Sequence, residues 1–313
     1  FFFKQKTAYE IYQCDWSSDV CSSDLLKALA DYTINRHFPE LEKQPEPYIG
    51  LLKAVINLQS KLIADWMRLG FVHGVMNTDN MSICGETIDY GPCAFINAYS
   101  PKMVFSSIDR EGRYAFGNQP MIGEWNLTRF AESLLPLIDG DQSEAIKIAS
   151  QCLDEYQSKF RDDWLGAMRK KLGIFDAEPE DLTLVEDLLM LMYKHQADYT
   201  NTFRNLNRPS QLSEHLLSDQ GFRDWMDKWN ERLSRQAQSI GDAQALMDQH
   251  NPLVIPRNHL VEGVLEDASK GDMQSFHELL NVLLMPYNQP KDDKFLSAPD
   301  ANYDKNYRTF CGT

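Results

Sequence analysis

GFVHGVMNTDNMSICGETIDYGP, residues 70 to 92, is the stretch from which the fold of this chain can be inferred. Its four consecutive residues Asn77 to Asn80 are typical of turns, so the backbone leaves regular structure there and side-chain oxygens project from a loop. Met81 to Cys84 and Thr87 to Ile88 predict two short strands around a tight turn. The resulting β-hairpin returns the chain to the point where the turn residues end.

Three oxygen-bearing side chains are expected at the open end of this hairpin: Asp79, Asn80 and Asp89. Converging oxygens suit a hard divalent cation such as Mg²⁺, above all one that also holds substrate phosphates. A solvated turn is the alternative, because Asp and Asn side chains commonly bond their own backbone. We favour the metal-binding interpretation because Asp89 ends a short apolar strand and precedes Tyr90 and Gly91, which is similar to the Asp-Phe-Gly element of protein kinases.

The spacing around His73 extends the similarity to kinases and also departs from it. In the kinase catalytic loop a His is followed at plus two by the catalytic Asp and at plus seven by a metal-binding Asn. Here Asn80 stands at plus seven, but Val75 stands at plus two and cannot take a proton. Asp79 is the nearest carboxylate that can replace the missing base. We interpret His73 as a structural residue that holds the loop through hydrogen bonds, with a direct catalytic role as the alternative.

The segments GFVHGVMNTDNMS and TIDYGP, including the valine at the usual position of the catalytic Asp, closely resemble the SelO family of kinase-like protein adenylyltransferases. The resemblance covers nearly all of the chain after residue 24. It extends to Asp31 to Pro39 (DYTINRHFP), Gly112 to Gln119 (GRYAFGNQ), Met192 to Asn205 (MYKHQADYTNTFRN) and Asn251 to Tyr287. It implies transfer of AMP from ATP to Ser, Thr or Tyr hydroxyls of proteins, with Mg²⁺ or Mn²⁺ as the cofactor.

The resemblance also assigns roles to the three residues at the hairpin. Carried over by position, it implies that Asp79 accepts a proton, that Asn80 and Asp89 bind the metal, and that Asp89 lies against the nucleotide phosphates. It further implies that the nucleotide is held in reverse relative to kinases, because AMP and not a phosphoryl group is transferred. The implied partners are ATP and protein substrates.

The composition limits the classes of partner. The chain has 313 residues, a formal net charge of −15, 43% hydrophobic and 25% charged residues, which is ordinary for a globular protein. An acidic field repels phosphate backbones, so we expect no nucleic-acid partner. Because no stretch approaches the ~20 consecutive apolar residues of a membrane span, we expect no membrane partner either.

The cysteines indicate a reducing compartment. Of the six cysteines, Cys14 and Cys21 fall in residues 1–25. The other four, Cys84, Cys93, Cys152 and Cys311, show no metal-ligand spacing, which fits a reducing cytoplasm and disfavours a disulfide scaffold or a zinc site. We expect a cytoplasmic, bacterial protein. Cys311 stands third from the end, where the SelO resemblance implies cysteine or selenocysteine, although a tail thiol without a role is the alternative. The family's redox link to a cysteine after Asp-Tyr-Gly aligns with Phe105 here, so a disulfide from Cys311 to Cys93 or Cys84 is left open.

The predicted fold class is mainly α. We expect a protein-kinase-like helical C-lobe with the short β-hairpin at its catalytic loop, followed by a C-terminal helical extension. Apolar residues recurring every three or four positions predict the helices. Their ranges are 26–38, 48–69, 121–138, 143–171, 180–205, 212–240, 260–269 and 273–284.

The predicted domains follow from these patterns. Residues 1–25 resemble a translated sequencing adapter, 26–139 form the kinase-like C-lobe with the metal loop, 140–288 are helical, and 289–313 form a polar tail, which we expect to be loosely held from Pro290 to Tyr307. No glycine-rich phosphate loop or lysine-bearing strand is visible; in the SelO family these precede the position of Asp31. We therefore expect a C-terminal fragment without its N-lobe, inactive alone. A kinase-like phosphotransferase and a non-catalytic helical protein-binding module are the alternatives.

The sequence favours structural roles for three further groups of residues. We assign Trp164, Trp225 and Trp229 to core packing. The acidic cluster of Glu178, Glu180 and Asp181 falls at a helix start, where the helix dipole favours negative charge. The group Lys194, His195 and Asp198 matches a family motif but equally fits a surface row of salt bridges.

Overall fold

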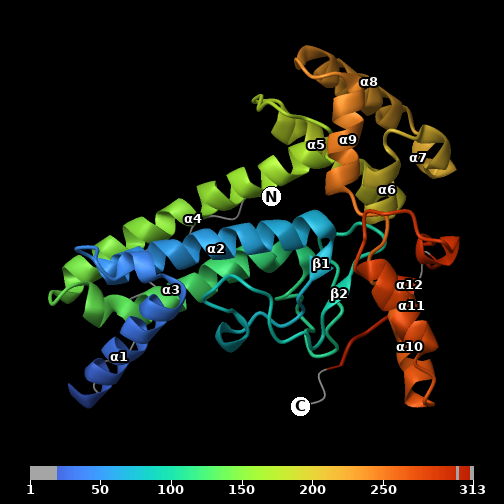
Figure 1. The fold of residues 1–313 in the computed structure, drawn as a ribbon. Helices are drawn as coiled ribbons and strands as arrows, with labels where there is room; N and C mark the ends of the chain where they lie inside the picture. The colour runs from blue at the N-terminus through green and yellow to red at the C-terminus, as the bar shows by residue number, and fades with distance from the viewer. Residues whose placement is uncertain (1–19, 301–302, 311–313) are drawn as a thin grey trace. The chain divides into compact units, whose positions relative to one another are not determined.

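The computed structural model describes residues 20–300 and 303–310, and in these residues the chain is mainly helical (Figure 1). The α-helices are α1 (Val20–His37), α2 (Pro47–Leu69), α3 (Gln119–Ile138), α4 (Gln142–Lys171), α5 (Asp181–His195), α6 (Tyr199–Asn205), α7 (Glu214–Leu217), α8 (Gln220–Arg235), α9 (Ile240–His250), α10 (Asn258–Ser269), α11 (Gln274–Leu283) and α12 (Tyr303–Asn306). The strands are β1 (Phe71–Val72) and β2 (Ala94–Phe95). Short 3₁₀ turns include η3 (Thr78–Asn80). The predicted mainly-α class is confirmed.

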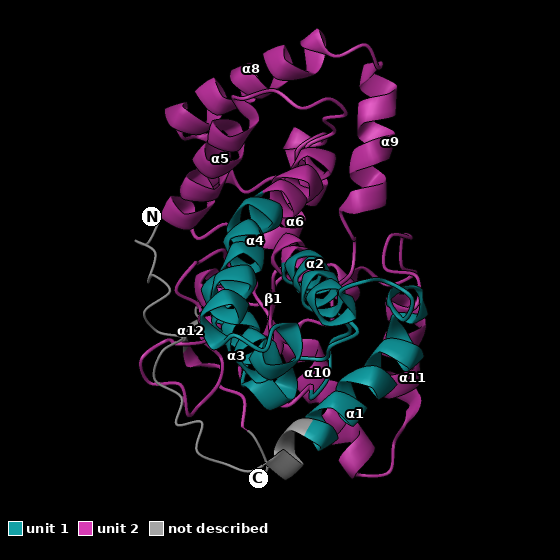
Figure 2. Ribbon diagram, turned by 90° about the vertical axis from the view of Figure 1, so that its left-hand side faces the viewer, with its two compact units in different colours: residues 1–63, 76–89, 120–161 teal, residues 64–75, 90–119, 162–313 magenta. Residues whose placement is uncertain are grey.

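The chain divides into two compact units, coloured separately in Figure 2. Unit 1 comprises residues 1–63, 76–89 and 120–161, and unit 2 comprises residues 64–75, 90–119 and 162–313. The predicted turn and hairpin residues 77 to 89 therefore all belong to unit 1. No helix in the described residues is long and apolar enough to cross a membrane.

The core of unit 1 is formed by the apolar faces of α1, α2, α3 and α4. Apolar residues recur at helical spacing on each of these helices and are buried together. On α2 the buried residues include Leu51, Leu52, Val55 and Ile56. This core lies directly under the predicted functional turn, because α2 and α3 also supply the side chains that hold the turn.

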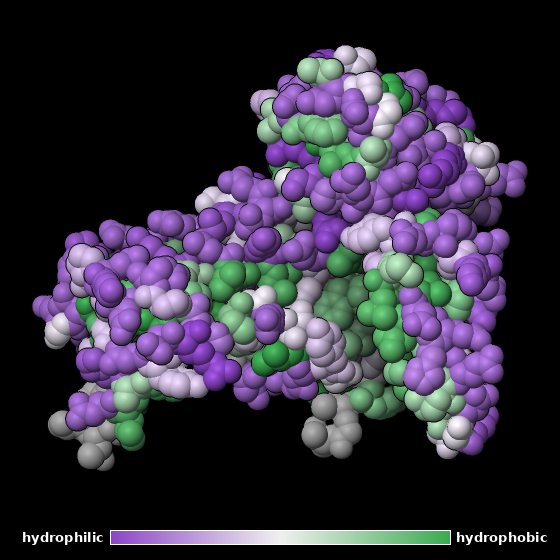
Figure 3. Space-filling view, viewed as in Figure 1, coloured by the Kyte–Doolittle hydropathy of each residue, from purple (hydrophilic) through white to green (hydrophobic). Residues whose placement is uncertain are grey.

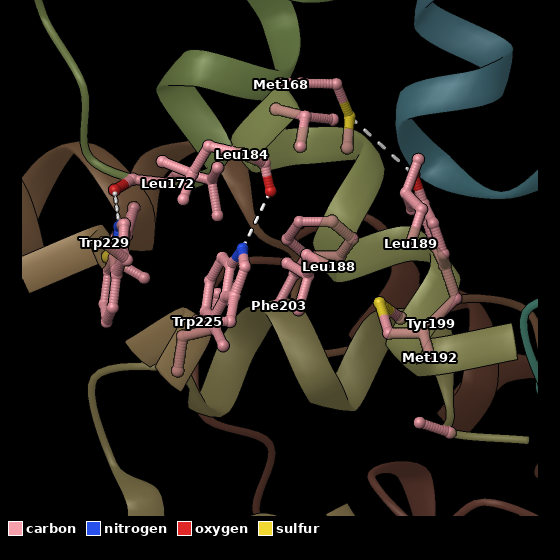
Figure 4. Close-up of a cluster of buried hydrophobic side chains, with 14 of the residues drawn as sticks. Met168, Leu172, Leu184, Leu188, Leu189, Met192, Tyr199, Phe203, Trp225 and Trp229 are labelled. Carbon is pink, nitrogen blue, oxygen red and sulfur yellow. Dashed lines mark hydrogen bonds between the residues drawn. The ribbon is translucent and has the colours of Figure 1, made fainter. Parts of the chain in front are cut away.

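The main core of unit 2 contains two stacked tryptophans on α8. Trp225 and Trp229 have ring centroids 5.8 Å apart and nearly parallel planes. Their indole N–H groups donate to the carbonyl oxygens of Leu184, at 2.8 Å, and Leu172, at 2.9 Å (Figure 4). Trp164 packs against the same cluster. The prediction that the tryptophans serve packing is confirmed, and their polar atoms are satisfied within the core.

A smaller core of unit 2 lies under α10 and α11. Val254, Leu279 and Phe295 are buried there, and partly buried apolar residues of both helices pack around them. Apolar side chains reach the surface of the molecule in places (Figure 3). In this part of unit 2, Leu265 of α10 and Leu284, which directly follows α11, are exposed.

The strand pairing differs from the predicted hairpin. Residues 81–88 form no strand; Met81 and Thr87 make a single antiparallel bridge. The antiparallel pair is instead β1 with β2, in which Phe71 faces Phe95 and Val72 faces Ala94. The prediction of two strands at 81–84 and 87–88 is therefore wrong, because so short a segment forms only one backbone pair. The turn itself is present, closed by the Gly85 N–H to the Ser82 carbonyl at 3.1 Å.

Two long predicted helices are interrupted. The range 180–205 breaks at Gln196, which adopts a left-handed φ of 49°, and the Asp198 side chain then caps α6 through the Asn201 N–H. The range 212–240 breaks into separate helices, with Asp219 capping α8. Apolar periodicity continues across such breaks, whereas side chains that bond backbone N–H groups start new helices.

Asp181 forms a buried ion network that the sequence interpretation missed. Its carboxylate is fully buried and accepts from Arg169 Nε and Arg232 Nε, each at 2.6 Å, and from the Glu178 N–H at 2.8 Å. Burial raises the pKa of Asp181, but the hydrogen bonds from Arg232, Glu178 and Arg169 outweigh it and leave the pKa below its usual value. The helix dipole alone is therefore an incomplete account of this acidic cluster, because Asp181 joins α4, α5 and α8.

The chain end is also held more firmly than predicted. Asp304 is buried and accepts from the Asn97 N–H at 2.9 Å and from Asn97 Nδ2 at 2.6 Å. The Thr309 N–H donates to the Phe105 carbonyl, and the Thr309 carbonyl accepts from the Ser107 N–H. The expectation of a loosely held tail is wrong for residues 303–310, because a buried carboxylate and a short backbone ladder fix this segment within unit 2.

Gly74 is the position at which we expect a methyl group to destabilise the fold most among the glycines of this loop. Its φ is 87°, and a Cβ there would lie 2.5 Å from the carbonyl oxygen of Pro92. We expect Gly74→Ala to lower the free energy of unfolding by about 2 kcal/mol or more, measured by urea denaturation.

Gly166 provides the matched control for this substitution. It lies inside α4, and nothing stands within 4 Å of a Cβ built on it. Gly166→Ala should raise the free energy of unfolding by about 0.5–1 kcal/mol, because alanine loses less conformational entropy in a helix. If both substitutions changed the free energy of unfolding in the same direction, the close contact predicted at Gly74 would be contradicted.

Candidate functional site

The turn that carries the predicted site residues is a 3₁₀ turn followed by the single bridge. Thr78 to Asn80 form η3, and the Asn80 N–H donates to the Asn77 carbonyl at 3.0 Å. Because Met81 and Thr87 pair antiparallel, the residues just before Met81 and just after Thr87 leave the bridge at the same end. Asn80 stands one residue before this bridge and Asp89 two residues after it, and the convergence of Asp79, Asn80 and Asp89 on one ion stays a prediction.

Asp89 has an unusual backbone for a residue with a side chain. Its φ is 52°, in the left-handed region, and only one other non-glycine residue in the described part of the chain, Gln196, shares this feature. Such a conformation costs roughly 1–3 kcal/mol and is concentrated at functional sites, although Asp tolerates it better than most residues. The fold maintains this conformation at the residue for which the sequence predicts a metal-binding role.

The two carboxylates of the site are open to ligands. Asp79 and Asp89 are exposed, and within the described residues neither carboxylate accepts a hydrogen bond or an ion pair. Asn80 is half-buried. Asp181 and Asp304 differ from them, because both are buried and accept hydrogen bonds from neighbouring residues.

Three amide side chains hold the backbone of this region. Gln119 accepts from the His73 N–H and donates to the Phe71 carbonyl, both at 3.0 Å. Asn126 Nδ2 donates to the Met76 carbonyl at 2.9 Å, and Gln59 Nε2 donates to the Ser82 carbonyl at 2.5 Å. All three amides are buried. These three residues were not predicted as part of the site. The feature that marks them in the sequence is an amide residue at a buried position of an otherwise apolar helix face.

His73 agrees with its structural interpretation. The residue is fully buried in unit 2, and its ring lies 5.3 Å from Trp66 and 6.4 Å from Phe71, centroid to centroid. Its backbone N–H is held by Gln119. This packing supports the structural interpretation, and the alternative of a direct catalytic role stays a prediction.

The donors at the turn fit a magnesium or manganese ion. An amide oxygen from Asn80 and a carboxylate from Asp89 are hard ligands, and Mg²⁺ commonly binds one or two such protein groups while water and substrate phosphates complete its octahedron. Within residues 20–300 and 303–310 no three His, Cys, Asp or Glu side chains form a metal cluster.

The second predicted motif separates into two unrelated contacts. Lys194 Nζ and His195 Nε2 both contact Asp219 Oδ2, at 2.6 and 2.8 Å, and these hydrogen bonds lower the pKa of Asp219. Asp198 instead forms an ion pair with Arg257 at 2.8 Å. The salt-bridge interpretation holds for Lys194 and His195, whereas Asp198 belongs to a different group of residues.

The cysteines do not form a disulfide among the described residues. Cys84 and Cys93 are half-buried thiols, Cys152 is buried, and burial raises the pKa of Cys93 and Cys152. Cys311 lies outside the described residues, so its predicted redox role stays a prediction. Phe105, which aligns with the family cysteine, is buried and its carbonyl accepts from the Thr309 N–H at 2.8 Å.

Curated proteins similar to this chain are nucleotidyltransferases. Those named "Protein nucleotidyltransferase YdiU" include the protein of Halalkalibacterium halodurans, 53% identical over 294 residues, which covers 93% of this chain and 60% of that protein. Those of Alkaliphilus metalliredigens and Brevibacillus brevis are 52% and 51% identical, over 92% and 94% of this chain and 59% and 60% of their own lengths.

A sequence model described as "Protein adenylyltransferase SelO" matches residues 13–284 of the chain. The chain belongs to the SelO family, and the resemblance inferred from its central stretch is confirmed. It spans about 60% of the length of the curated relatives that it matches. The activity of a whole SelO protein is therefore a proposal for this chain.

Proposed function

We propose that this chain is the metal-binding part of a kinase-like protein adenylyltransferase, which transfers AMP from ATP to Ser, Thr or Tyr hydroxyls of proteins. Membership of the SelO family supports nucleotidyl transfer. The observation that carries the site assignment is Asp89, an exposed carboxylate in a left-handed backbone at the same end of the bridge as Asp79.

The chemistry assigns one role to each residue. The hydroxyl oxygen of the target attacks the α-phosphorus of ATP, a new O–P bond forms, and the bond to the β-phosphate oxygen breaks to release pyrophosphate. Asp79 accepts the hydroxyl proton, since its carboxylate is open at the turn. Asn80 and Asp89 bind Mg²⁺ or Mn²⁺, which when bound offsets the charge that develops on the phosphates. Asp89 also positions the nucleotide phosphates through that ion.

The position of ATP label on the product tests the proposal. The complete reading frame containing this chain is incubated with a protein mixture and ATP labelled on either the α- or the γ-phosphate. We expect retention of the α-label and no retention of the γ-label. Retention of the γ-label would instead establish phosphotransfer, and retention of neither label would favour a non-catalytic helical binding module.

A further inference from the structure

A cavity of about 340 Å³ lies in unit 1 beside the turn that carries Asp79 and Asn80. Thr78 and Met81, the residues on either side of that pair, form part of its wall. Ser82 and Ile83 of the same turn also line it, and residues of α2 and α3 complete the wall, so the cavity is built from the turn and the two helices that hold it. Its volume is at the lower end of the range for ligand-binding pockets.

The polar lining of the cavity contains buried acceptors without donors. Gln59 and Asn126 are 3% and 6% exposed, and their amide nitrogens bond backbone carbonyls. Their oxygens, Gln59 Oε1 and Asn126 Oδ1, have no hydrogen-bond partner in the described residues. Because a buried acceptor left without a donor is unfavourable, a ligand that brings N–H or O–H groups is favoured here.

The charge of the cavity does not suit a nucleotide. Arg129 is the one cationic side chain in its lining, and its guanidinium is already paired with Glu132 at 2.8 Å. Arg129 Nε has no partner among the described residues and is available for a single neutral acceptor such as a carbonyl. A triphosphate needs several positive groups to bind it. A peptide main chain instead offers N–H groups for the two unpaired amide oxygens and C=O groups for Arg129 Nε.

The remaining lining is apolar. Val55, Ile83, Leu127 and Phe130 contribute aliphatic and aromatic surface to the cavity. This surface favours an apolar side chain over a charged one, since burying an unpaired charge is strongly unfavourable. Together the polar and apolar groups match a short peptide with an apolar side chain.

We propose that this cavity is the acceptor-peptide subsite, and that it selects an apolar residue next to the hydroxyl residue to be modified. This proposal rests on the proposed transfer function, because the turn that carries the proposed base Asp79 forms one wall of the cavity. The cavity is thus a specificity-determining site in the same unit as the proposed catalytic residue.

Direct peptide binding to the 313-residue chain tests this proposal without requiring transfer. The probes are two fluorescein-labelled peptides, Ala-Ala-Ala-Leu-Ser-Leu-Ala-Ala-Ala and the same peptide with Asp in place of both Leu. By fluorescence anisotropy we expect the leucine peptide to bind at least 10-fold more tightly. Equal affinity for the two peptides would overturn the proposal.

A pair of matched variants locates the binding. Ser133 is an exposed helical serine that lines the cavity and bonds the carbonyl three residues earlier. Ser158 is an exposed helical serine with the same kind of bond on α4, away from the cavity lining. We expect Ser133→Trp to abolish the 10-fold preference and Ser158→Trp to retain it. A preference that survives in Ser133→Trp would overturn the proposal.

The two failures can be told apart. If the complete reading frame transfers AMP but the preference for leucine does not depend on Ser133, only the subsite is wrong. If no transfer occurs while Ser133→Trp still abolishes peptide binding, the cavity is a peptide site and the proposed function fails. Thermal melting of both tryptophan variants shows whether each is folded, and the comparison of the two peptides on the unmodified chain does not depend on them.

Discussion

Asp89→Asn is expected to lower kcat/KM for AMP incorporation at least ~100-fold, equivalent to about 2.7 kcal/mol of transition-state stabilisation. Asn tolerates the left-handed backbone that Asp89 adopts, so the substitution removes the charge and one oxygen ligand without requiring a new loop conformation. The measurement is incorporation of α-labelled AMP by the complete protein, with thermal melting as a test of folding.

Glu86→Gln is the matched control for this prediction. Glu86 is an exposed carboxylate in the same turn, between the bridge residues Met81 and Thr87. The substitution removes the same charge from a residue that has no role in the proposed chemistry. AMP incorporation should therefore change less than about 2-fold. Equal losses in the two variants would mean that the general acidity of the turn matters and not a ligand at Asp89.

Asp181→Ala is expected to lower the free energy of unfolding by about 3–5 kcal/mol, measured by urea denaturation. The carboxylate is fully buried between Arg169 and Arg232, and Arg232 is itself only 2% exposed. Removing the carboxylate takes away the partner of Arg232 Nε and leaves the buried guanidinium with Glu178, at 3.3 Å, and the Asp176 carbonyl, which is more unfavourable than losing one hydrogen bond.

The pair of Glu266 and Lys270 serves as the control, because its atoms are also 2.6 Å apart but both side chains are more than half exposed. Glu266→Ala should change stability by no more than about 0.5 kcal/mol, since solvent screens an exposed pair. A similar loss from the two substitutions would show that burial does not determine the contribution of Asp181.

The contribution of Asp181 to the free energy of unfolding depends on pH in a definite direction. The folded-state pKa of Asp181 is lowered, so the folded protein holds this carboxylate in its charged form more strongly than the unfolded chain does. Its stabilisation is present above the usual pKa of 3.8 and is lost as the pH falls through the lower folded-state value. The difference in stability between the wild type and Asp181→Ala should therefore narrow in strong acid.

The helices were largely predictable, and their interruptions were not. Regular spacing of apolar residues located α2, α3 and α4 within a few residues of their observed ends. The same spacing continued through Gln196 and Asp219, where a left-handed residue and a capping side chain end one helix and begin the next. Periodicity reports which side of a helix is buried, whereas helix ends depend on individual hydrogen bonds.

For the candidate site, the sequence predicted the turn but not the side chains that support it. The roles of Asp79, Asn80 and Asp89 stay predictions, and the bridge between Met81 and Thr87 is the backbone feature that supports them. An amide at a buried position of an apolar helix face marks Gln59, Gln119 and Asn126 as unusual, but the backbone atoms that they hold are distant in sequence, so no local pattern predicts these bonds. The pairing of β1 with β2 was missed for the same reason, because two-residue strands carry too little pattern.

The anchoring of the chain end sets the order in which the protein can be completed during synthesis. Asn97 meets Asp304 across 207 residues of sequence, and closing a loop of that length carries an entropic cost of roughly 5 kcal/mol. At ~5–20 residues per second, a ribosome takes roughly 10–40 s to make the chain between them. Throughout that time Asn97, Phe105 and Ser107 lack the partners that Asp304 and Thr309 supply, so this part of the chain is held only by earlier residues such as Ala197 and stays more accessible to chaperones and proteases.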